Sequence, residues 1–270
     1  MAIQGFDRSG FEKVLKEHLS PTTPIRSPEF LRGREKKLED IRRSLVATGR
    51  HIFVYGDRGV GKTSLAQTAA YQHQSADQQP VLLTCDPSTG FYRLAHDLAV
   101  ALTRIDPTLI KKSDKKTVKA GFKSLISIEM QNAIESGNVP EIRSINEVIS
   151  VIDYASRKHS KEPVAVIDEF ERIKSEEERV LFADFIKQLG DQSVPLKLIF
   201  CGVGLSLGEL LDSHHSCYRY LTTIELERLG FDGRLEIIDN ALAAFDLTMM
   251  TPHVIELPKS AMAILILFIL

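Results

Sequence analysis

The chain has 270 residues, of which 43% are hydrophobic, so it is long enough to bury one sizeable core. Its 34 lysines and arginines nearly balance 36 aspartates and glutamates, and a formal net charge of −2 excludes bulk charge as the basis for binding nucleic acid or a membrane surface. The three cysteines show no metal-ligand spacing and the N-terminus lacks the apolar run of a signal peptide. We therefore expect a reduced, cytoplasmic protein.

The first part of the chain is expected to be a polar arm followed by a helix. Residues 1–28 end in a proline-rich stretch, and prolines disfavour a helix. The segment "GREKKLEDIRRSLVATG" then repeats Leu38, Ile41 and Leu45 at helical spacing, with Gly49 as its stop. This pattern predicts an amphipathic helix at the start of the globular part.

Further along the chain, short apolar segments alternate with longer amphipathic ones. The segments expected as strands are 51–56, 80–85, 163–170, 195–203 and 222–226. The segments expected as helices between them are 61–74, 90–105, 145–158 and 175–190. Strands that alternate with long helices favour a mostly parallel sheet covered on both faces.

The segment "YGDRGVGKTS" matches the P-loop pattern G-x-x-x-x-G-K-[ST], and it lies between an apolar strand and a helix as that motif requires. Its glycines let backbone N–H groups point at phosphate oxygens, and the helix adds the positive end of its dipole. Lys62 is predicted to reach the β- and γ-phosphates, Thr63 to bind Mg²⁺, and Ser64 to lie near the α-phosphate. The predicted ATP-binding residues of the loop are Gly56, Asp57, Arg58, Gly59, Val60, Gly61, Lys62, Thr63 and Ser64. A turn that merely joins strand to helix does not need this lysine and hydroxyl.

The segment "VAVIDEFERI" is the second candidate for nucleotide chemistry. Four apolar residues form a buried strand that brings Asp168 to its carboxyl end, where ligands bind in open α/β sheets. Asp168 is predicted to hold Mg²⁺, and Glu169 to polarise the attacking water as general base. The alternative is a solvated helix start, where acidic residues are favourable in any case.

Three segments together, "FLRGREKKLEDI", "GDRGVGKTS" and "VAVIDEFERI", resemble the AAA+ ATPases, in the branch that includes replication-origin ATPases, transposition ATPases and STAND-like signalling NTPases. The resemblance implies an α/β fold, a three-layer P-loop NTPase sandwich with a parallel sheet of order 5-1-4-3-2 and a partial helical lid. It divides the chain into an arm (1–28), an ATPase core (29–228) and a partial or truncated lid (229–270).

The resemblance also implies a role for the "FLRGRE" segment. In that group it packs near the adenine, so Leu31, Gly33 and Arg34 resemble neighbours of the base and ribose, and Arg34 is predicted to contact ATP. The alternative is that Arg34 and Glu35 only begin a helix.

Two features depart from the group. Where its fourth strand ends in a polar residue that touches the γ-phosphate, this chain offers Cys201, Gly202 and Val203, with Ser206 as a substitute or a simple cap. The lid helix "GFDGRLEIIDNALAAF" is followed by no recognisable helical bundle, and the apolar run at 261–270 is too short to span a bilayer. We therefore expect a degenerate or truncated lid, and no membrane partner.

Ser216-x-x-Arg219, just before the fifth strand, resembles the place where this group carries an arginine that reaches a neighbouring subunit's ATP. A guanidinium suits the charge that develops on the γ-phosphate. Arg58 and Arg172 are not expected to supply this charge within one chain, because one lies in the loop and the other directly follows the acidic pair. Arg219 is therefore predicted to be catalytic in a head-to-tail assembly; the alternative is a surface pair with an acid such as Asp212.

The sequence thus predicts an ATPase that requires ATP and Mg²⁺ and uses them for self-association or for remodelling a nucleic-acid or protein partner. The alternative is a nucleotide-dependent switch with little or no turnover, and a small-molecule kinase fits less well. A possible DNA contact is the lysine cluster at 111–123, although a solvated helix face explains that cluster better.

Overall fold

The computed structural model describes residues 31–75, 78–103, 139, 142–213 and 215–243. Three features discussed above lie outside these residues: the predicted arm at 1–28, the lysine cluster at 111–123 and the apolar run at 261–270. The side chains of 211–213, 215–216 and 241 are also outside the description.

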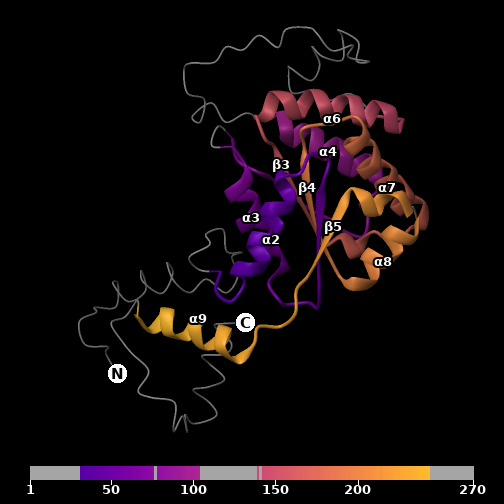
Figure 1. The fold of residues 1–270 in the computed structure, drawn as a ribbon. Helices are drawn as coiled ribbons and strands as arrows, with labels where there is room; N and C mark the ends of the chain where they lie inside the picture. The colour runs from indigo at the N-terminus through magenta and orange to yellow at the C-terminus, as the bar shows by residue number, and fades with distance from the viewer. Residues whose placement is uncertain (1–30, 76–77, 104–138, 140–141, 214, 244–270) are drawn as a thin grey trace, which may run out of the picture.

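A five-stranded sheet forms the centre of the molecule (Figure 1). Its strands are β1 (His51–Tyr55), β2 (Val81–Thr84), β3 (Val164–Asp168), β4 (Lys197–Gly202) and β5 (Leu221–Glu225). The order across the sheet is β2-β3-β4-β1-β5, and every neighbouring pair is parallel. This confirms the predicted order 5-1-4-3-2. The strand that leads into the P-loop, β1, lies between β4 and β5.

Helices connect the strands and form the two outer layers. They are α2 (Glu35–Val46), α3 (Lys62–His73), α4 (Phe91–Thr103), α6 (Ile145–His159), α7 (Glu176–Asp191), α8 (Gly204–Ser213) and α9 (Phe231–Ala243), with the 3₁₀ turns η2 (Phe170–Arg172) and η3 (His215–Arg219). The predicted pattern of Leu38, Ile41 and Leu45 is confirmed, since all three are buried on α2. Helix α8 was not expected from the sequence.

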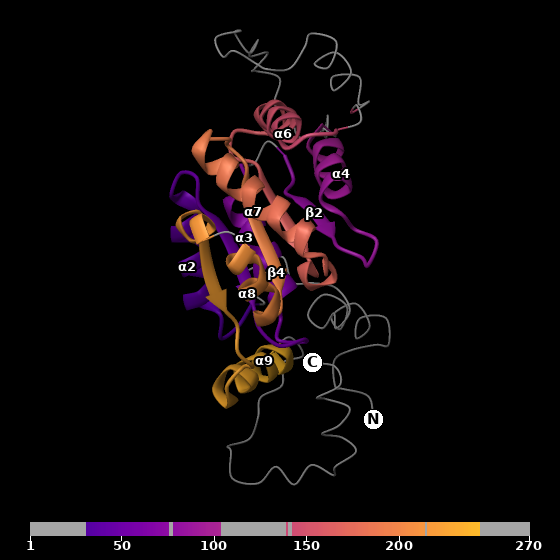
Figure 2. The ribbon, with the colours of Figure 1, turned by 90° about the vertical axis from the view of Figure 1, so that its right-hand side faces the viewer.

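The sheet is covered on both faces because its central strands are continuous buried runs whose successive side chains point to opposite faces. Ile52 and Val54 of β1 pack in one cluster with α2 and α3, whereas Phe53 between them packs in the other with α4, α6, α7 and α8. Figures 1 and 2 show these helices on opposite sides of the sheet. The result is the predicted three-layer arrangement.

One aromatic residue of the acidic segment is part of this core. Phe170, directly after Glu169, is fully buried. Its ring lies edge-on to Phe53, Phe182 and Phe200, with centroids 5.7, 5.2 and 5.2 Å away. Such pairs add about 0.5–1.5 kcal/mol each beyond the area that they bury. The core therefore fixes the backbone that carries the acidic residues.

Helix α9 lies beyond the carboxyl ends of the strands, on the side of the loop that follows β1 (Figure 1). Gly33 has φ +67°, and a Cβ there would lie 3.0 Å from the side chain of Leu229 and 3.3 Å from the backbone of Gly233. The segment before α2 therefore packs closely against the start of α9. No helix in the described ranges is long and apolar enough to cross a membrane.

Candidate functional site

The loop Gly56–Gly61 has the backbone shape that a phosphate cradle needs. Gly59 and Gly61 have φ +78° and +91°, and a Cβ built on either meets no atom within 4 Å. The space over the loop is therefore open. Gly56 is required for a different reason: a Cβ there would lie 2.1 Å from the carbonyl oxygen of Leu226. Only glycine permits this approach of loop and β5 together with a positive φ.

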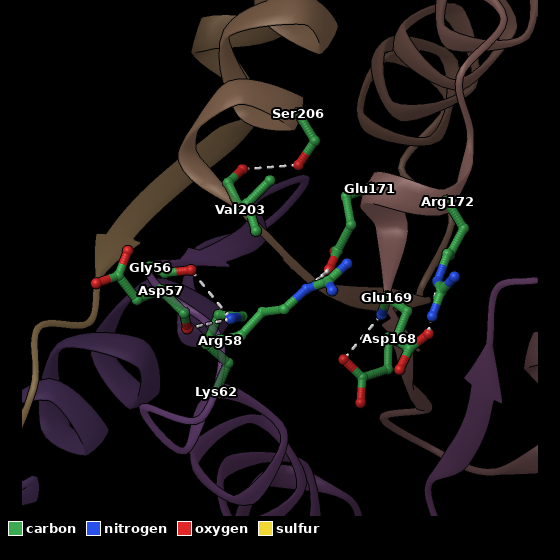
Figure 3. A network of polar contacts seen from close by, with 10 residues as sticks. All are labelled: Gly56, Asp57, Arg58, Lys62, Asp168, Glu169, Glu171, Arg172, Val203 and Ser206. Carbon is green, nitrogen blue, oxygen red and sulfur yellow. Dashed lines mark hydrogen bonds and ion pairs between the residues drawn. The ribbon is translucent and has the colours of Figure 1, made fainter.

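Lys62 is the first residue of α3, and its ammonium group lies against the loop itself. It donates to the carbonyl oxygens of Gly56, at 3.0 Å, and Asp57, at 2.7 Å (Figure 3). The side chain is therefore folded over the cradle, at the positive end of the helix dipole. A bound polyphosphate would meet this ammonium group in addition to the backbone N–H groups.

Thr63 and Asp168 join the P-loop to the end of β3. The Thr63 hydroxyl donates to Asp168 Oδ2 at 2.7 Å, across 105 residues of sequence. Hard oxygen ligands of this kind are the ones that Mg²⁺ takes in nucleotide sites. The two residues predicted to hold the metal are thus in direct contact, and their chemistry fits the ion.

Glu169 occupies an unusual backbone conformation for a residue with a side chain. Its φ and ψ are 54° and 38°, in the left-handed region, which costs roughly 1–2 kcal/mol. Its N–H donates to Asp168 Oδ1 at 2.8 Å, and buried Phe170 holds the turn from the other side. The Glu169 carboxylate lies 3.0 Å from Arg172 Nε. Strained backbone held by its surroundings is typical of functional sites.

Arg58, predicted to bind ATP as part of the loop, pairs with an acidic residue here, and its contact with ATP stays a prediction. Its side chain leaves the P-loop and extends toward Glu171 (Figure 3), where Nε lies 3.9 Å from Oε1. Arg58 is 76% exposed, whereas the Glu171 side chain is only 15% exposed. The loop arginine therefore reaches the acidic segment of the same chain, which the sequence pattern did not reveal.

The Arg34 side chain is hydrogen-bonded to two backbone carbonyl groups. Its guanidinium donates to Val60 in the P-loop, at 3.3 Å, and to Glu227, which follows β5. The residue is only 8% exposed, and this burial lowers its pKa. Arg34 thus ties the P-loop to the segment that leads into α9. Its predicted contact with ATP stays a prediction.

The end of β4 offers little polar chemistry. Burial raises the pKa of the Cys201 thiol well above its usual value, and Sγ lies 3.8 Å from the Lys62 carbonyl oxygen. The Ser206 hydroxyl donates to the Val203 carbonyl at 2.7 Å, and Ser206 is buried. Ser206 is the third residue of α8 and its hydroxyl donates to a carbonyl, whereas an N-cap accepts from a backbone N–H, so this bond is not an N-cap.

Arg219 lies at the amino ends of the strands, whereas the P-loop lies at their carboxyl ends. It ends η3, and β5 then pairs Leu221 with His51, the first residue of β1, whereas the P-loop follows the last residue of β1. Arg219 is exposed, and its guanidinium lies 5.7 Å from the centroid of the Tyr220 ring. The side chains of Asp212 and Ser216 lie outside the described ones. The length of β1, about 13 Å, separates Arg219 from its own P-loop.

The predicted residues therefore fall into three places. The structure brings together, at the carboxyl ends of the strands, the loop, Lys62, Thr63, Asp168 and Glu169. Arg34 contacts the loop through the Val60 carbonyl group. Arg219 lies at the amino ends of the strands. The sequence missed the two ion pairs that Arg58 and Arg172 make with acidic residues beside this site. Glu169 and Arg172 are three residues apart, and Arg58 and Glu171 are far apart in the sequence, so neither spacing indicated an ion pair.

Three solved structures are similar to this chain, and the first of them shows the shared fold. A Walker-type ATPase of Pyrococcus abyssi matches with TM-score 0.51 and 17% identity, over 85% of this chain and 63% of that one. A DNA replication initiation factor matches with TM-score 0.43 and 18% identity, over 86% and 55%. Aeropyrum pernix Orc1 in complex with DNA matches with TM-score 0.46 and 13% identity, over 84% and 52%. The chain thus spans between half and two thirds of the length of these proteins.

No curated protein matches the sequence. The family profile described as an AAA ATPase domain matches residues 31–199, which is more than half of the chain. That range includes the P-loop, the Asp168 strand and most of the sheet. The chain belongs to the AAA ATPase domain family and has the fold of an AAA+ P-loop ATPase.

Proposed function

We propose that the protein binds and hydrolyses Mg-ATP and uses this cycle to drive self-association or to remodel a nucleic-acid or protein partner. The single observation that supports this best is the 2.7 Å hydrogen bond from the Thr63 hydroxyl to Asp168 Oδ2. It brings a P-loop hydroxyl and a strand-end carboxylate to one point beside an open, glycine-lined cradle. A purely structural turn would not need this combination.

Each residue of the site has a distinct task in this proposal. The loop N–H groups and Lys62 hold the phosphates, and Lys62 exchanges the Gly56 and Asp57 carbonyl oxygens for phosphate oxygens. Mg²⁺, when bound by Thr63 and Asp168, neutralises charge on the phosphates. Glu169 accepts the proton of the attacking water.

Glu169 must be released from part of its present environment to act as a base. Its carboxylate pairs with Arg172 at 3.0 Å, and the two side chains are 45% and 41% exposed. An ion pair this exposed is weak. It therefore offers little resistance when the Glu169 carboxylate moves toward a water molecule. Because Phe170 anchors the turn in the core, the backbone of Glu169 need not move.

A second chain completes the site in this proposal. Arg219 is exposed at the edge of the sheet opposite its own P-loop, which supports a role across a head-to-tail interface rather than within one chain. Its guanidinium would cover the outer side of the γ-phosphate of the neighbour. Hydrolysis should then rise more than linearly with protein concentration.

Mixing two inactive variants tests this role. Arg219→Ala keeps the nucleotide pocket but lacks the arginine that would reach the neighbouring chain's ATP (the arginine finger). We expect it to lower turnover about a thousandfold without weakening ATP binding. Lys62→Ala lacks the pocket but keeps the finger. A mixture should recover activity, because only a shared site combines the intact parts. If both variants fold and associate and the mixture stays inactive, Arg219 has no role in trans.

The alternative function is a nucleotide-dependent switch with little turnover. It is favoured by the end of β4, where Cys201 is buried and the Ser206 hydroxyl is bonded to Val203. Phosphate release measured with and without DNA, together with the mass of the protein with and without ATP, separates the two. An ATP-dependent mass change without phosphate release would support the switch. DNA-stimulated release would identify nucleic acid as the partner.

A further inference from the structure

We infer that Arg58 contacts the γ-phosphate of ATP bound to its own chain and thereby distinguishes ATP from ADP. The inference rests on the proposed function, because it requires a nucleotide on the P-loop. Arg58 is the third residue of that loop, and its side chain extends away from the loop toward Glu171 (Figure 3). Its guanidinium pairs with this carboxylate across the carboxyl edge of the sheet, at 3.9 Å.

Two contacts join the P-loop motif to the end of β3 and to the turn that follows it, and so span one gap. The Thr63 hydroxyl meets Asp168 at 2.7 Å, and Arg58 meets Glu171 at 3.9 Å. A phosphate chain that lies on the loop and shares Mg²⁺ with Thr63 and Asp168 must end in this gap. The terminal phosphate therefore comes within reach of the Arg58 guanidinium.

The strand between these segments leaves a place for such a cation. β4 lies between β1 and β3, and its end presents Cys201, Gly202 and Val203. The Cys201 thiol is buried against the Lys62 carbonyl, and the Ser206 hydroxyl is used by Val203. Among the described side chains at this end of β4, none is directed as a donor to the gap. Arg58 reaches it from the loop instead.

The Arg58–Glu171 pair is suited to being exchanged. An ion pair 3.9 Å long with a 76% exposed arginine is weak and screened by salt. A phosphate offers the guanidinium two or three charged oxygens that match its planar fork, which makes the stronger partner. Because ADP lacks the terminal phosphate, we expect Arg58 to stay with Glu171 when ADP is bound.

Glu171 is held where it can receive the arginine back. Its side chain is 15% exposed, and its Oε2 is buried with no hydrogen-bond partner among the described residues. It follows Phe170, whose ring is fixed in the core. Glu171 therefore competes with the γ-phosphate for Arg58 from a fixed position.

The test compares the affinities of Mg-AMP-PNP and Mg-ADP by titration calorimetry at a protein concentration where the chain does not associate. Arg58→Ala should lower the ratio of AMP-PNP to ADP affinity about tenfold or more, the scale of one charge-assisted hydrogen bond, with ADP affinity unchanged. Arg58→Lys should lower the ratio less. Glu171→Gln should raise the ratio, by up to about fivefold, because it removes the competitor.

Arg228→Ala is the matched control. Arg228 is also exposed, at 82%, and its Nε lies 3.9 Å from the loop residue Asp57, so it carries the same charge near the same loop but faces another acid. Its substitution should leave the ratio unchanged. A fall in the ratio as large as that of Arg58→Ala would mean general electrostatics and would overturn the inference.

The remaining outcomes separate this inference from the proposed function. If the wild type binds neither nucleotide, as expected for Lys62→Ala, then the proposed function is wrong and the role of Arg58 falls with it. If the wild type binds both and Arg58→Ala leaves the ratio unchanged, or lowers both affinities alike, only the role of Arg58 is wrong. Unchanged urea midpoints for Arg58→Ala and Arg228→Ala, and a separately measured midpoint for the less exposed Glu171→Gln, would show that the substitutions leave the fold intact.

Discussion

Replacing Arg34 by methionine should destabilise the protein even when no nucleotide is present. The buried guanidinium donates to the carbonyl oxygens of Val60 and Glu227 and so joins the P-loop to the segment after β5. Hydrogen bonds from a charged donor contribute roughly 1.5–3 kcal/mol each, and relief of the desolvation that lowers the Arg34 pKa offsets part of this loss. We expect the free energy of unfolding to fall by about 2–3 kcal/mol.

Urea unfolding followed by circular dichroism measures this change. With an m-value of about 3 kcal/mol/M, the midpoint should fall by roughly 0.7–1 M. Arg42→Met is the control, because exposed Arg42 lies on α2, the helix that begins directly after Arg34, and among the described residues it pairs with Glu39. A normal midpoint for Arg34→Met combined with weakened ATP binding would refute this reasoning. Arg34 would then act as the predicted ATP ligand instead of as a backbone tie.

Two further predictions concern the loop and the sheet. Lys62→Ala should abolish ATP binding in calorimetry while leaving the protein folded, because its ammonium group faces the cradle and not the core. The urea midpoint should fall by less than in Arg34→Met, because Lys62 is less buried, and retained ATP affinity would contradict the P-loop assignment. Burial lowers the pKa of His51 to about 3, so the unfolded chain takes up a proton near pH 6.5 that the folded chain does not. The free energy of unfolding should therefore fall as the pH drops below about 6.5, by up to about 1.4 kcal/mol per pH unit, and by less in His51→Asn.

Most strands and helices could be predicted because local patterns of apolar residues indicate them. Apolar runs ending at Tyr55 and Asp168 predict buried parallel strands, and the order of the sheet followed from the resemblance to the AAA+ ATPases. Helix α8 was missed because "GLSLGELLDS" contains two glycines and two serines, which weaken helix propensity. Packing against α7 gives this helix the support that its own sequence lacks.

The arrangement of the candidate site was predictable where backbone geometry decides it. The glycines and Lys62 follow from the needs of a phosphate cradle, and Asp168 from its place at the end of a strand. The partners of Arg58, Glu169 and Arg34 were not predictable, because long charged side chains can reach several acceptors at similar cost. Only the folded positions of Glu171, Arg172 and the Val60 carbonyl select among them.

Single-turnover phosphate release with Glu169→Gln tests the central claim, that this site hydrolyses ATP, most directly. The account predicts that the variant still binds Mg-ATP but releases phosphate roughly a hundredfold more slowly than the wild type, the scale of a positioned base. Glu177→Gln, an exposed acid in the first turn of α7, should match the wild type. Equal rates for Glu169→Gln and the wild type would contradict the role of Glu169, and no release from the wild type at any protein concentration would contradict hydrolysis itself.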